Sequence, residues 1–316
     1  MIRWGIMGLG NIAHEFAQGM KVLHPIYGAC ARDYEKTKAF CETYQVEHGY
    51  HSYEEMLEDE HIDIIYIATV NSQHYQNIMA CLKHGKHVLC EKAIWGNYEE
   101  LKEAYAYAKQ HELLLCEAMT IYHMPIFTKI KEMISQGILG KIKLVEADLG
   151  SLKEDDPHNR FFSKELGGGA MLDIGTYTLS FLRFFLEGRL LDMKHVMCKY
   201  PTGVDEMWGI CITTDQGEIG NANMTFRAKL PKRGVIAGDK AYITVYNYVR
   251  AQEAILTYPD GTSETIVCGE TEKALTYEIA DIEESILHWG CGKDHMDKTM
   301  DVVAMMDRLL RQEGLL

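Results

Sequence analysis

The chain has 316 residues, of which 46 are acidic and 32 basic, so its formal net charge is −14. A charge this negative argues against nucleic acid or an anionic membrane surface as the main partner. At about 150 residues per domain the length predicts two domains. The composition, 47% hydrophobic and 25% charged, is typical of a globular protein with a sizeable core. An anionic ligand would need positive charge that is assembled locally.

The cysteines and the apolar segments indicate a reducing compartment, the cytoplasm. The nine cysteines are odd in number and none forms a Cys-x-x-Cys pair, which disfavours a disulfide framework or a zinc knuckle. Residues 1–6 lead directly into a predicted strand and lack the regions of a signal peptide. The most apolar stretch, residues 62–70, is far shorter than the ~20 residues that span a bilayer. We therefore expect no membrane partner.

The first 120 residues alternate short apolar runs with helical patterns. Strands are predicted at 2–7, 26–31, 62–67, 88–90 and 113–118, and helices at 12–20, 34–44, 53–57, 73–84 and 98–110. Ser52 with Glu55, and Asn97 with Glu100, have the spacing of N-terminal capping boxes. This alternation predicts an α/β fold, a doubly wound parallel Rossmann sheet, and a dinucleotide-binding domain over residues 1–120.

Beyond residue 120 the pattern changes to strands in series. Helices are predicted at 125–136, from the triple glycine at 167–169 to about 186, at 274–289 and at 298–312. Strands are predicted at 141–150, 195–199, 207–214, 218–226, 234–237, 241–245, 254–258 and 263–267. Turn residues at 215–217 and 259–261 mark hairpins, so the sheet is expected to be open and mainly antiparallel. Residues 121–316 are predicted to form the domain for substrate binding and oligomerisation.

One strand of this second sheet points to self-association. Residues 207–212 are apolar on both strand faces, and one face can pack on helices of the same chain. The other face would be an exposed apolar patch unless a second subunit covers it. We expect a homodimer, or a dimer of dimers, through the C-terminal sheet, with burial inside the monomer as the alternative.

A glycine motif directly follows the first predicted strand. Residues 8–13 read Gly-Leu-Gly-Asn-Ile-Ala, a G-x-G-x-x-A run at a strand–helix junction. Gly8 permits the tight turn, Gly10 lets the backbone approach a pyrophosphate, and the small third residue lets helix and strand pack closely. The anion would lie on the free N–H groups of the helix start, at Asn11 and Ile12. The motif predicts dinucleotide binding.

The end of the second strand bears on the choice between NADP and NAD. Arg32 follows the last strand residue, Ala31, and can pair with a 2′-phosphate and stack on the adenine. Lys36 lies one helical turn further on. We expect NADP. Asp33 keeps NAD as the alternative, because a small register shift would let its carboxylate bind the ribose.

Two further segments carry charged or hydroxyl side chains at informative places. Glu91 and Lys92 stand at the carboxyl end of the strand at 88–90, the edge where open α/β sheets bind ligands. The triple glycine at 167–169 leads into a helix whose Asp173 and Tyr177 are spaced i, i+4 and so share one face.

With the glycine motif, these segments make the whole chain strongly resemble the glucose–fructose oxidoreductase, inositol dehydrogenase and rhizopine-catabolism (Gfo/Idh/MocA) family of NAD(P)-dependent oxidoreductases. Within it the chain is most similar to the branch of dimeric dihydrodiol dehydrogenases and glucose–fructose oxidoreductase. The resemblance extends to residues 117–119 and 305–307. It implies catalytic roles for Lys92, Asp173 and Tyr177, and it places Thr69, Asn71 and His74 near the nicotinamide ribose and pyrophosphate.

The chemistry needs these residue types. Hydride transfer between a carbinol carbon and nicotinamide requires a proton to leave or join the substrate oxygen. Tyr177 can serve as this acid or base if its pKa, ordinarily about 10, is lowered. The Lys92 ammonium would favour the phenolate and could hydrogen-bond the substrate oxygen. Asp173 would orient substrate hydroxyls or the lysine.

Position 93 departs from the family pattern, in which proline follows the lysine and is commonly preceded by a cis bond. Here Ala93 stands in its place, so the bond is expected to be either trans with a shifted Lys92, or cis and held by its surroundings.

Weaker candidates for the substrate side are His123, Arg160 and Phe161. The pairs His48/His51 and His84/His87 lack further ligands, so we expect no metal.

The sequence thus predicts an NADP(H)-dependent oxidoreductase acting on the hydroxyl or carbonyl group of a sugar-like or cyclic diol substrate. Two alternatives stay open. A dinucleotide-binding sensor without activity is disfavoured by the joint presence of Lys92, Asp173 and Tyr177. A glycosidase that uses bound NAD for transient oxidation would generally have histidine in place of Tyr177.

Overall fold

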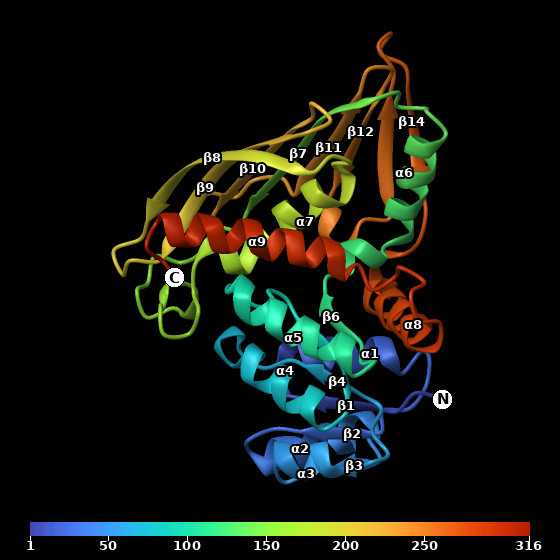
Figure 1. Ribbon diagram of the computed structural model, residues 1–316, viewed down its shortest axis with the longest axis vertical. Helices are drawn as coiled ribbons and strands as arrows, with labels where there is room; N and C mark the ends of the chain where they lie inside the picture. The colour runs from blue at the N-terminus through green and yellow to red at the C-terminus, as the bar shows by residue number, and fades with distance from the viewer. The chain divides into compact units, whose positions relative to one another are not determined.

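The structure, a computed structural model, describes residues 1–316. The chain divides into two compact units (Figure 1). The first unit comprises residues 1–119 and 272–300, and the second comprises 120–271 and 301–316. Sequence patterning suggested a single boundary near residue 120, and it gave no sign that residues 272–300 group with the first unit.

The first unit is built on a six-stranded parallel sheet in the order β3-β2-β1-β4-β5-β6. Its strands are β1 (Trp4–Met7), β2 (Gly28–Cys30), β3 (His48–Gly49), β4 (Ile64–Ile67), β5 (His87–Glu91) and β6 (Leu115–Ala118). Its helices are α1 (Asn11–Met20), α2 (Tyr34–Tyr44), α3 (Tyr53–Glu58), η1 (Asn71–Gln73), α4 (His74–Lys83) and α5 (Tyr98–Gln110). This order confirms the predicted doubly wound Rossmann sheet. The two-residue β3 and the short helix η1 were not predicted.

Side-chain caps fix where several of these helices begin. The carboxylate of Asp33 accepts a hydrogen bond from Glu35 N at the start of α2, and Ser52 Oγ accepts one from Glu55 N at the start of α3. Asn97 Oδ1 accepts from the backbone of both Glu99 and Glu100 at the start of α5. The predicted caps at Ser52 and Asn97 are therefore confirmed. The cap made by Asp33 was not foreseen.

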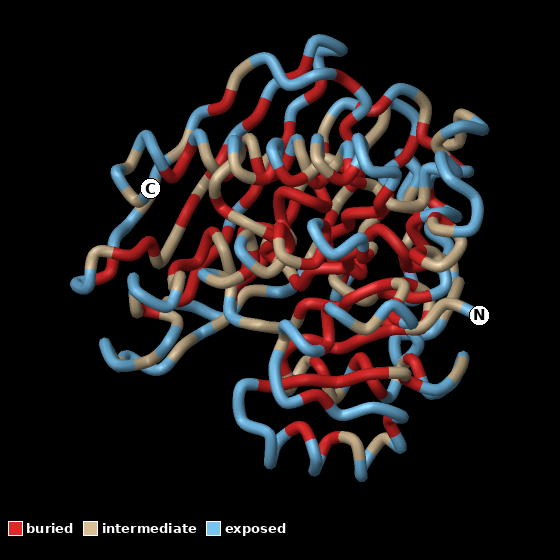
Figure 2. Tube along the Cα trace, turned by 60° about the horizontal axis from the view of Figure 1, so that its bottom comes forward, coloured by how far each residue is buried: buried red, intermediate tan, exposed pale blue.

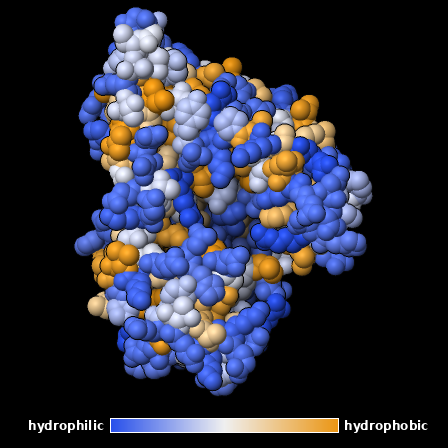
Figure 3. Space-filling view, turned by 180° about the vertical axis from the view of Figure 1, so that it is seen from behind, coloured by the Kyte–Doolittle hydropathy of each residue, from blue (hydrophilic) through white to orange (hydrophobic).

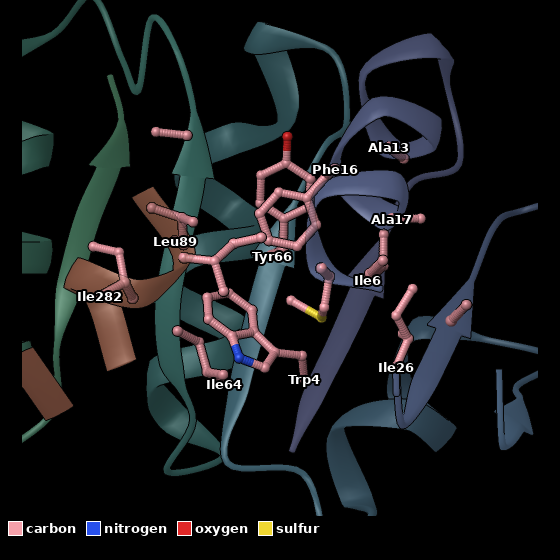
Figure 4. Close-up of a cluster of buried hydrophobic side chains, with 14 of the residues drawn as sticks. Trp4, Ile6, Ala13, Phe16, Ala17, Ile26, Ile64, Tyr66, Leu89 and Ile282 are labelled. Carbon is pink, nitrogen blue, oxygen red and sulfur yellow. The ribbon is translucent and has the colours of Figure 1, made fainter. Parts of the chain in front are cut away.

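Helix α8 (Ala274–Leu287) joins the first unit because it completes that unit's core. Ile279 and Ile282 are fully buried in the cluster around Trp4 and Tyr66 (Figure 4), where the Tyr66 ring stacks on Phe16 at 3.7 Å between centroids. The two helices α1 and α8 pack together. Removing such side chains from water supplies most of the driving force for folding, so a segment distant in sequence is held here by its apolar face.

The second unit is an eight-stranded sheet in the order β14-β13-β12-β11-β7-β10-β9-β8. Its strands are β7 (Ile142–Gly150), β8 (Leu190–Lys199), β9 (Asp205–Thr214), β10 (Ile219–Thr225), β11 (Arg233–Gly238), β12 (Tyr242–Tyr246), β13 (Glu253–Thr257) and β14 (Ser263–Val267). All neighbours are antiparallel except β7 and β10. The predicted mainly antiparallel sheet and both hairpins are confirmed.

Helices cover one face of this sheet. They include η2 (Thr120–His123), α6 (Pro125–Ser135), η3 (Arg160–Phe162), α7 (Thr176–Phe185) and η5 (Tyr248–Arg250), while α9 (Met296–Gln312) begins in the first unit and ends in the second. Helix α7 packs on β7 and β10, and the Phe181 ring lies where a side chain at Gly234 would be. Buried strand residues therefore alternate with exposed ones, as the tube in Figure 2 shows.

The opposite face of the second sheet is open and mixed in character. Across its middle, Arg233, Asp148 and Asn223 lie side by side on β11, β7 and β10, and Asp148 accepts hydrogen bonds from both neighbours at 2.7 and 3.0 Å. Exposed apolar side chains flank this row, with Val196 74% and Tyr246 50% exposed. The outward face of residues 207–212 presents Met207, Gly209 and Cys211. This face is thus less apolar than the sequence suggested.

The face drawn in Figure 3 is mostly hydrophilic, with scattered hydrophobic side chains. No helix combines the length and the apolar composition needed to cross a bilayer.

Candidate functional site

The glycine motif forms a tight loop between β1 and α1. Gly8 has φ +90°, a conformation that favours glycine, and its N–H donates to Cys30 O at 2.9 Å. A Cβ at Gly8 would lie 2.9 Å from Ala68 O, whereas a Cβ at Gly10 would meet nothing within 4 Å. Gly10 and Asn11 are exposed, and no side chain caps the start of α1. The loop therefore leaves open space directly before a helix N-terminus, which fits the pyrophosphate of a dinucleotide.

The residues after β2 separate into a structural and an exposed set. Asp33 caps α2, and Thr37 Oγ1 accepts a hydrogen bond from Ala31 N at 2.9 Å. Arg32 and Lys36 are exposed. The Asp33 carboxylate is thus hydrogen-bonded to the start of its own helix, whereas Arg32 and Lys36 are exposed to solvent just beyond the strand.

Lys92 directly follows β5. The preceding Glu91 is buried and accepts hydrogen bonds from Tyr66 Oη and from Lys92 N, the latter at 3.2 Å. The bond between Lys92 and Ala93 is cis, one of the two expected arrangements. Lys92 itself is half-buried.

His74 holds this segment from the start of α4. Its ring is fully buried, with Nδ1 3.0 Å from Ala93 O and Nε2 3.1 Å from Thr69 O. Burial lowers the pKa of the ring, and backbone carbonyls partly oppose that shift. Both nitrogens of His74 face backbone carbonyls, so the ring braces the segment that follows Lys92. Its expected place beside the cofactor stays a prediction.

Thr69 and Asn71 both follow β4 and are half-buried. Thr69 Oγ1 accepts a hydrogen bond from Asn77 Nδ2 at 2.9 Å. Asn71 begins the short helix η1. They stand after the strand next to β1, at the carboxyl edge that also bears Gly8 and Lys92.

Sequence reasoning missed a buried carboxyl group at the same edge. Glu117 on β6 is 2% exposed, and its carboxylate accepts hydrogen bonds from Ile94 N at 2.9 Å and Thr299 Oγ1 at 3.0 Å. Burial raises its pKa to about 7, and the nearby Glu91 adds to the shift while Lys92 opposes it. The signal was visible in the sequence, because Glu117 is the one acidic residue between 113 and 118 in a predicted buried strand.

In the second unit, Asp173 and Tyr177 lie on a continuous helical stretch. Residues Met171–Gly175 form a π-helical turn that leads into α7, so Asp173 is on the turn and Tyr177 on the helix. Single π turns are frequent at functional sites. Both residues are half-buried, and Tyr177 lies near Tyr248, a fully buried tyrosine whose hydroxyl has no hydrogen-bond partner.

Asp205 fixes the start of this stretch. It is 3% exposed and accepts hydrogen bonds from Met171 N at 2.6 Å and Trp208 Nε1 at 2.7 Å. Burial raises the pKa of its carboxyl group. Gly169, at φ +121°, passes so close that a Cβ there would be 2.2 Å from Asp205 Oδ1. The triple glycine is therefore explained by this close approach and by its turn.

Lys153, which sequence reasoning did not single out, contacts Asp173. Its Nζ lies 3.5 Å from Asp173 Oδ2 and 3.5 Å from the centroid of the Phe161 ring. Arg160 is exposed and lies over the same ring at 4.5 Å. His123 is buried in η2. Of the predicted substrate-side residues, Arg160 and Phe161 thus gather around Lys153 and Asp173.

No group of three or more histidine, cysteine, aspartate or glutamate side chains in the chain is arranged to hold a metal ion. His48, His51 and His84 are exposed, and His87 Nδ1 accepts a hydrogen bond from Leu114 N at 2.9 Å.

Comparison with known proteins agrees with this geometry. Residues 2–119 match the profile of an oxidoreductase family with an NAD-binding Rossmann fold, and residues 127–244 match the GFO/IDH/MocA C-terminal domain. A trans-1,2-dihydrobenzene-1,2-diol dehydrogenase of Xenopus laevis is 29% identical over 332 residues, which cover 99% of this chain and 98% of the relative. The Danio rerio enzyme of the same name is 31% identical over 250 residues, covering 77% and 74%.

Solved structures share the fold. An aldose–aldose oxidoreductase from Caulobacter crescentus superposes with a TM-score of 0.88 at 19% identity, covering 99% of this chain and 98% of the other. KijD10, a 3-ketoreductase from Actinomadura kijaniata in complex with NADP and TDP-benzene, gives 0.84 at 21% identity, covering 97% and 96%.

The fold, the glycine loop and the relatives together define an NAD(P)-dependent oxidoreductase. The chain belongs to the GFO/IDH/MocA family, as its motifs predicted, and its relatives include dihydrodiol dehydrogenases.

Proposed function

We propose that the chain is an NADP(H)-dependent enzyme that moves a hydride between nicotinamide and a hydroxyl-bearing or carbonyl carbon of a sugar-like or cyclic diol substrate. The observation that carries the proposal is the open space at Gly10 before an uncapped helix, on the same sheet edge as Lys92. The names of the relatives, dihydrodiol dehydrogenase and 3-ketoreductase, support this substrate class.

The preference for NADP rests on the residues after β2. In a site selective for NAD an acidic side chain binds the ribose 2′-hydroxyl. Asp33 is engaged in capping α2, whereas Arg32 and Lys36 are exposed. A guanidinium can bind a 2′-phosphate in bidentate fashion. We therefore assign Arg32 and Lys36 to the 2′-phosphate, and the backbone of Gly8, Gly10, Asn11 and Ile12 to the pyrophosphate. The cofactor side is completed by Thr69, Asn71, His74 and Glu91. The last two act by holding the backbone around Lys92.

We assign to Lys92 and Tyr177 the transfer of the proton that the substrate oxygen gains or loses. Nicotinamide, when bound, supplies or accepts the hydride. The substrate oxygen must then gain or lose a proton, and a tyrosine hydroxyl beside an ammonium group can exchange one near neutral pH because the ammonium favours the phenolate. Lys92 would hold that oxygen by a hydrogen bond while Tyr177 moves the proton.

Asp173 is assigned to substrate hydroxyls. A carboxylate accepts two hydroxyl hydrogen bonds, and Lys153 at 3.5 Å orients it from the other side. The Phe161 ring has Lys153 and Arg160 over it, so it holds these two cationic side chains on the substrate side. His123 remains a weaker candidate on this side.

Self-association through the open face of the second sheet belongs to the proposal. Val196 and Tyr246, 74% and 50% exposed, are the apolar side chains that a second copy would cover. Val196→Glu should shift the sedimentation of the protein toward the monomer, and Leu287→Glu on α8, also exposed, should not. Equal sedimentation of Val196→Glu and the unaltered protein would argue against this interface.

We also propose a cytoplasmic location. Cys30, Cys81, Cys90 and Cys116 are buried free thiols, and burial raises their pKa values, so they are unreactive side chains that suit a reducing compartment.

The test is a titration followed by a substrate panel. NADPH and NADH are titrated by fluorescence into the unaltered protein and into Arg32→Ala, which should lose about tenfold or more in NADPH affinity and little in NADH affinity. Dihydrodiols, aldoses, ketoses and polyols are then screened for a change in nicotinamide absorbance. Tight NADPH binding without turnover on the whole panel would favour the sensor. Unchanged NADPH affinity in Arg32→Ala would remove the NADP assignment.

A further inference from the structure

Glu117 joins three segments of the first unit that are distant in sequence. It lies on β6, with Cys90 of β5 as its neighbour across the sheet. One carboxylate oxygen accepts the hydrogen bond from Ile94 N, two residues beyond Lys92, and the other accepts that of Thr299 Oγ1 near the start of α9. Because Glu117 is 2% exposed, water does not compete for these contacts.

A buried carboxyl group is costly to ionise unless its charge is balanced. Two charged groups shift the pKa of Glu117: the Glu91 carboxyl group raises it and the Lys92 ammonium group lowers it. Both carboxyl groups raise the pKa of the neighbouring Cys90 thiol. Glu278 of α8 contributes to raising the pKa of two other buried groups of this unit, Tyr66 and Cys116. On the side of α4, Lys92 also contributes to lowering the pKa of the buried His74 ring, after the burial that is its main cause. Lys92 is the lysine of this set, and no arginine belongs to it.

We propose that Glu117 is a positioning residue for Lys92: its carboxylate holds the backbone that follows Lys92 and supplies the negative charge that stabilises the Lys92 ammonium. The inference rests on the proposed function, in which Lys92 holds the substrate oxygen. The Glu91 carboxylate accepts hydrogen bonds from Tyr66 Oη and from Lys92 N, so it holds the backbone at Lys92 itself. Glu117 fixes the other side of the same short segment through Ile94.

The test separates the charge from the packing. In Glu117→Gln the amide oxygen can accept from Ile94 N and the amide nitrogen can donate to Thr299 Oγ1, so both contacts survive and only the charge is lost. Glu99→Gln is the matched control, because Glu99 is an exposed carboxylate on α5 of the same unit.

The readout is the titration of Lys92 itself in the full chain without cofactor, followed by carbon-13 NMR after reductive methylation of the lysines. Lys92→Arg identifies the signal by removing it. Removing a negative charge that acts on an ammonium group disfavours its charged form, so Glu117→Gln should lower the Lys92 pKa, with a change of about threefold in its protonation equilibrium. Glu99→Gln should leave it unchanged.

The same Lys92 pKa in Glu117→Gln and the unaltered protein, with both proteins folded at the pH of the titration, would overturn the proposal. So would a shift of equal size in Glu99→Gln. Because the titration needs no substrate, it decides the role of Glu117 even if the proposed reaction fails. Where turnover is found, Glu117→Gln should shift the pH profile of kcat in the same direction while leaving the NADPH affinity unchanged.

Discussion

The two glycines of the nucleotide loop give opposite predictions for the same substitution. In Gly8→Ala the new Cβ would lie 2.9 Å from Ala68 O and 3.0 Å from Ala68 C, and the residue would keep φ +90°. A strained backbone of this kind costs about 1–3 kcal/mol. The contact is with backbone that is itself held, since Ala68 N donates to Met7 O at 2.8 Å. We expect Gly8→Ala to lower the free energy of unfolding by about 3 kcal/mol.

Gly10→Ala should have little effect on folding. Its Cβ would meet nothing within 4 Å, and φ −85° is open to alanine. The expected change in the free energy of unfolding is within about 0.5 kcal/mol. The methyl group would instead occupy the space where the backbone approaches the pyrophosphate. We expect the Kd for NADPH to rise by about tenfold or more, equivalent to about 1.4 kcal/mol.

Thermal unfolding and NADPH fluorescence titration, at one fixed salt concentration, separate the two effects. At about 2–4 °C per kcal/mol, Gly8→Ala should lower the Tm by about 6–12 °C. Gly217→Ala is the control for backbone strain alone, because Gly217 has φ +75° with nothing within 4 Å of its Cβ. Unchanged NADPH affinity in Gly10→Ala would refute the assignment of the loop to the pyrophosphate. A Tm for Gly8→Ala equal to that of Gly10→Ala would refute the steric argument.

Two further predictions concern buried carboxyl groups. The pKa of Glu117 rises on folding from 4.5 to about 7, so the folded state binds more protons between these values, and the group's contribution to stability falls as the pH rises through that window. The free energy of unfolding of Glu117→Gln relative to the unaltered protein, from urea titrations at pH 5 and pH 8, should therefore rise by about 3 kcal/mol, and a constant difference would contradict the burial of the charge. Asp205→Ala leaves two buried N–H donors, of Met171 and Trp208, without an acceptor, and should cost about 3 kcal/mol in the same assay. A cost no larger than that of the exposed Asp215→Ala would contradict this reading.

The fold could be predicted from sequence wherever apolar periodicity is strong. The strands and helices of the Rossmann sheet follow from short apolar runs between capped helices, and the Ser52 and Asn97 caps were readable from spacing alone. The grouping of α8 with the first unit could not be read, because an amphipathic helix does not specify which distant core its apolar face will join.

The candidate site was predicted in part for a similar reason. Residues fixed by a local motif, such as Gly8 and Lys92, stand out in sequence. Contacts between segments do not: the Lys153–Asp173 pair and the Glu117–Thr299 hydrogen bond join residues 20 or more positions apart. The π turn before α7 also escaped prediction. Met171 N at its start donates to the carboxylate of Asp205, 34 positions further on, and residue spacing gives no sign of such a contact.

The central claim, that Tyr177 and Lys92 of this chain carry the proton during hydride transfer to or from NADP(H), is tested most directly by single-turnover kinetics. Premixed protein and NADPH deuterated at the transferred position would be mixed with a carbonyl substrate found in the panel, with Tyr177→Phe and Lys92→Met as variants. We predict a deuterium isotope effect on nicotinamide oxidation in the unaltered protein. In both variants the rate should fall by about 100-fold or more, the scale of general acid–base catalysis, with NADPH affinity retained. A rate in Tyr177→Phe equal to that of the unaltered protein would contradict the account.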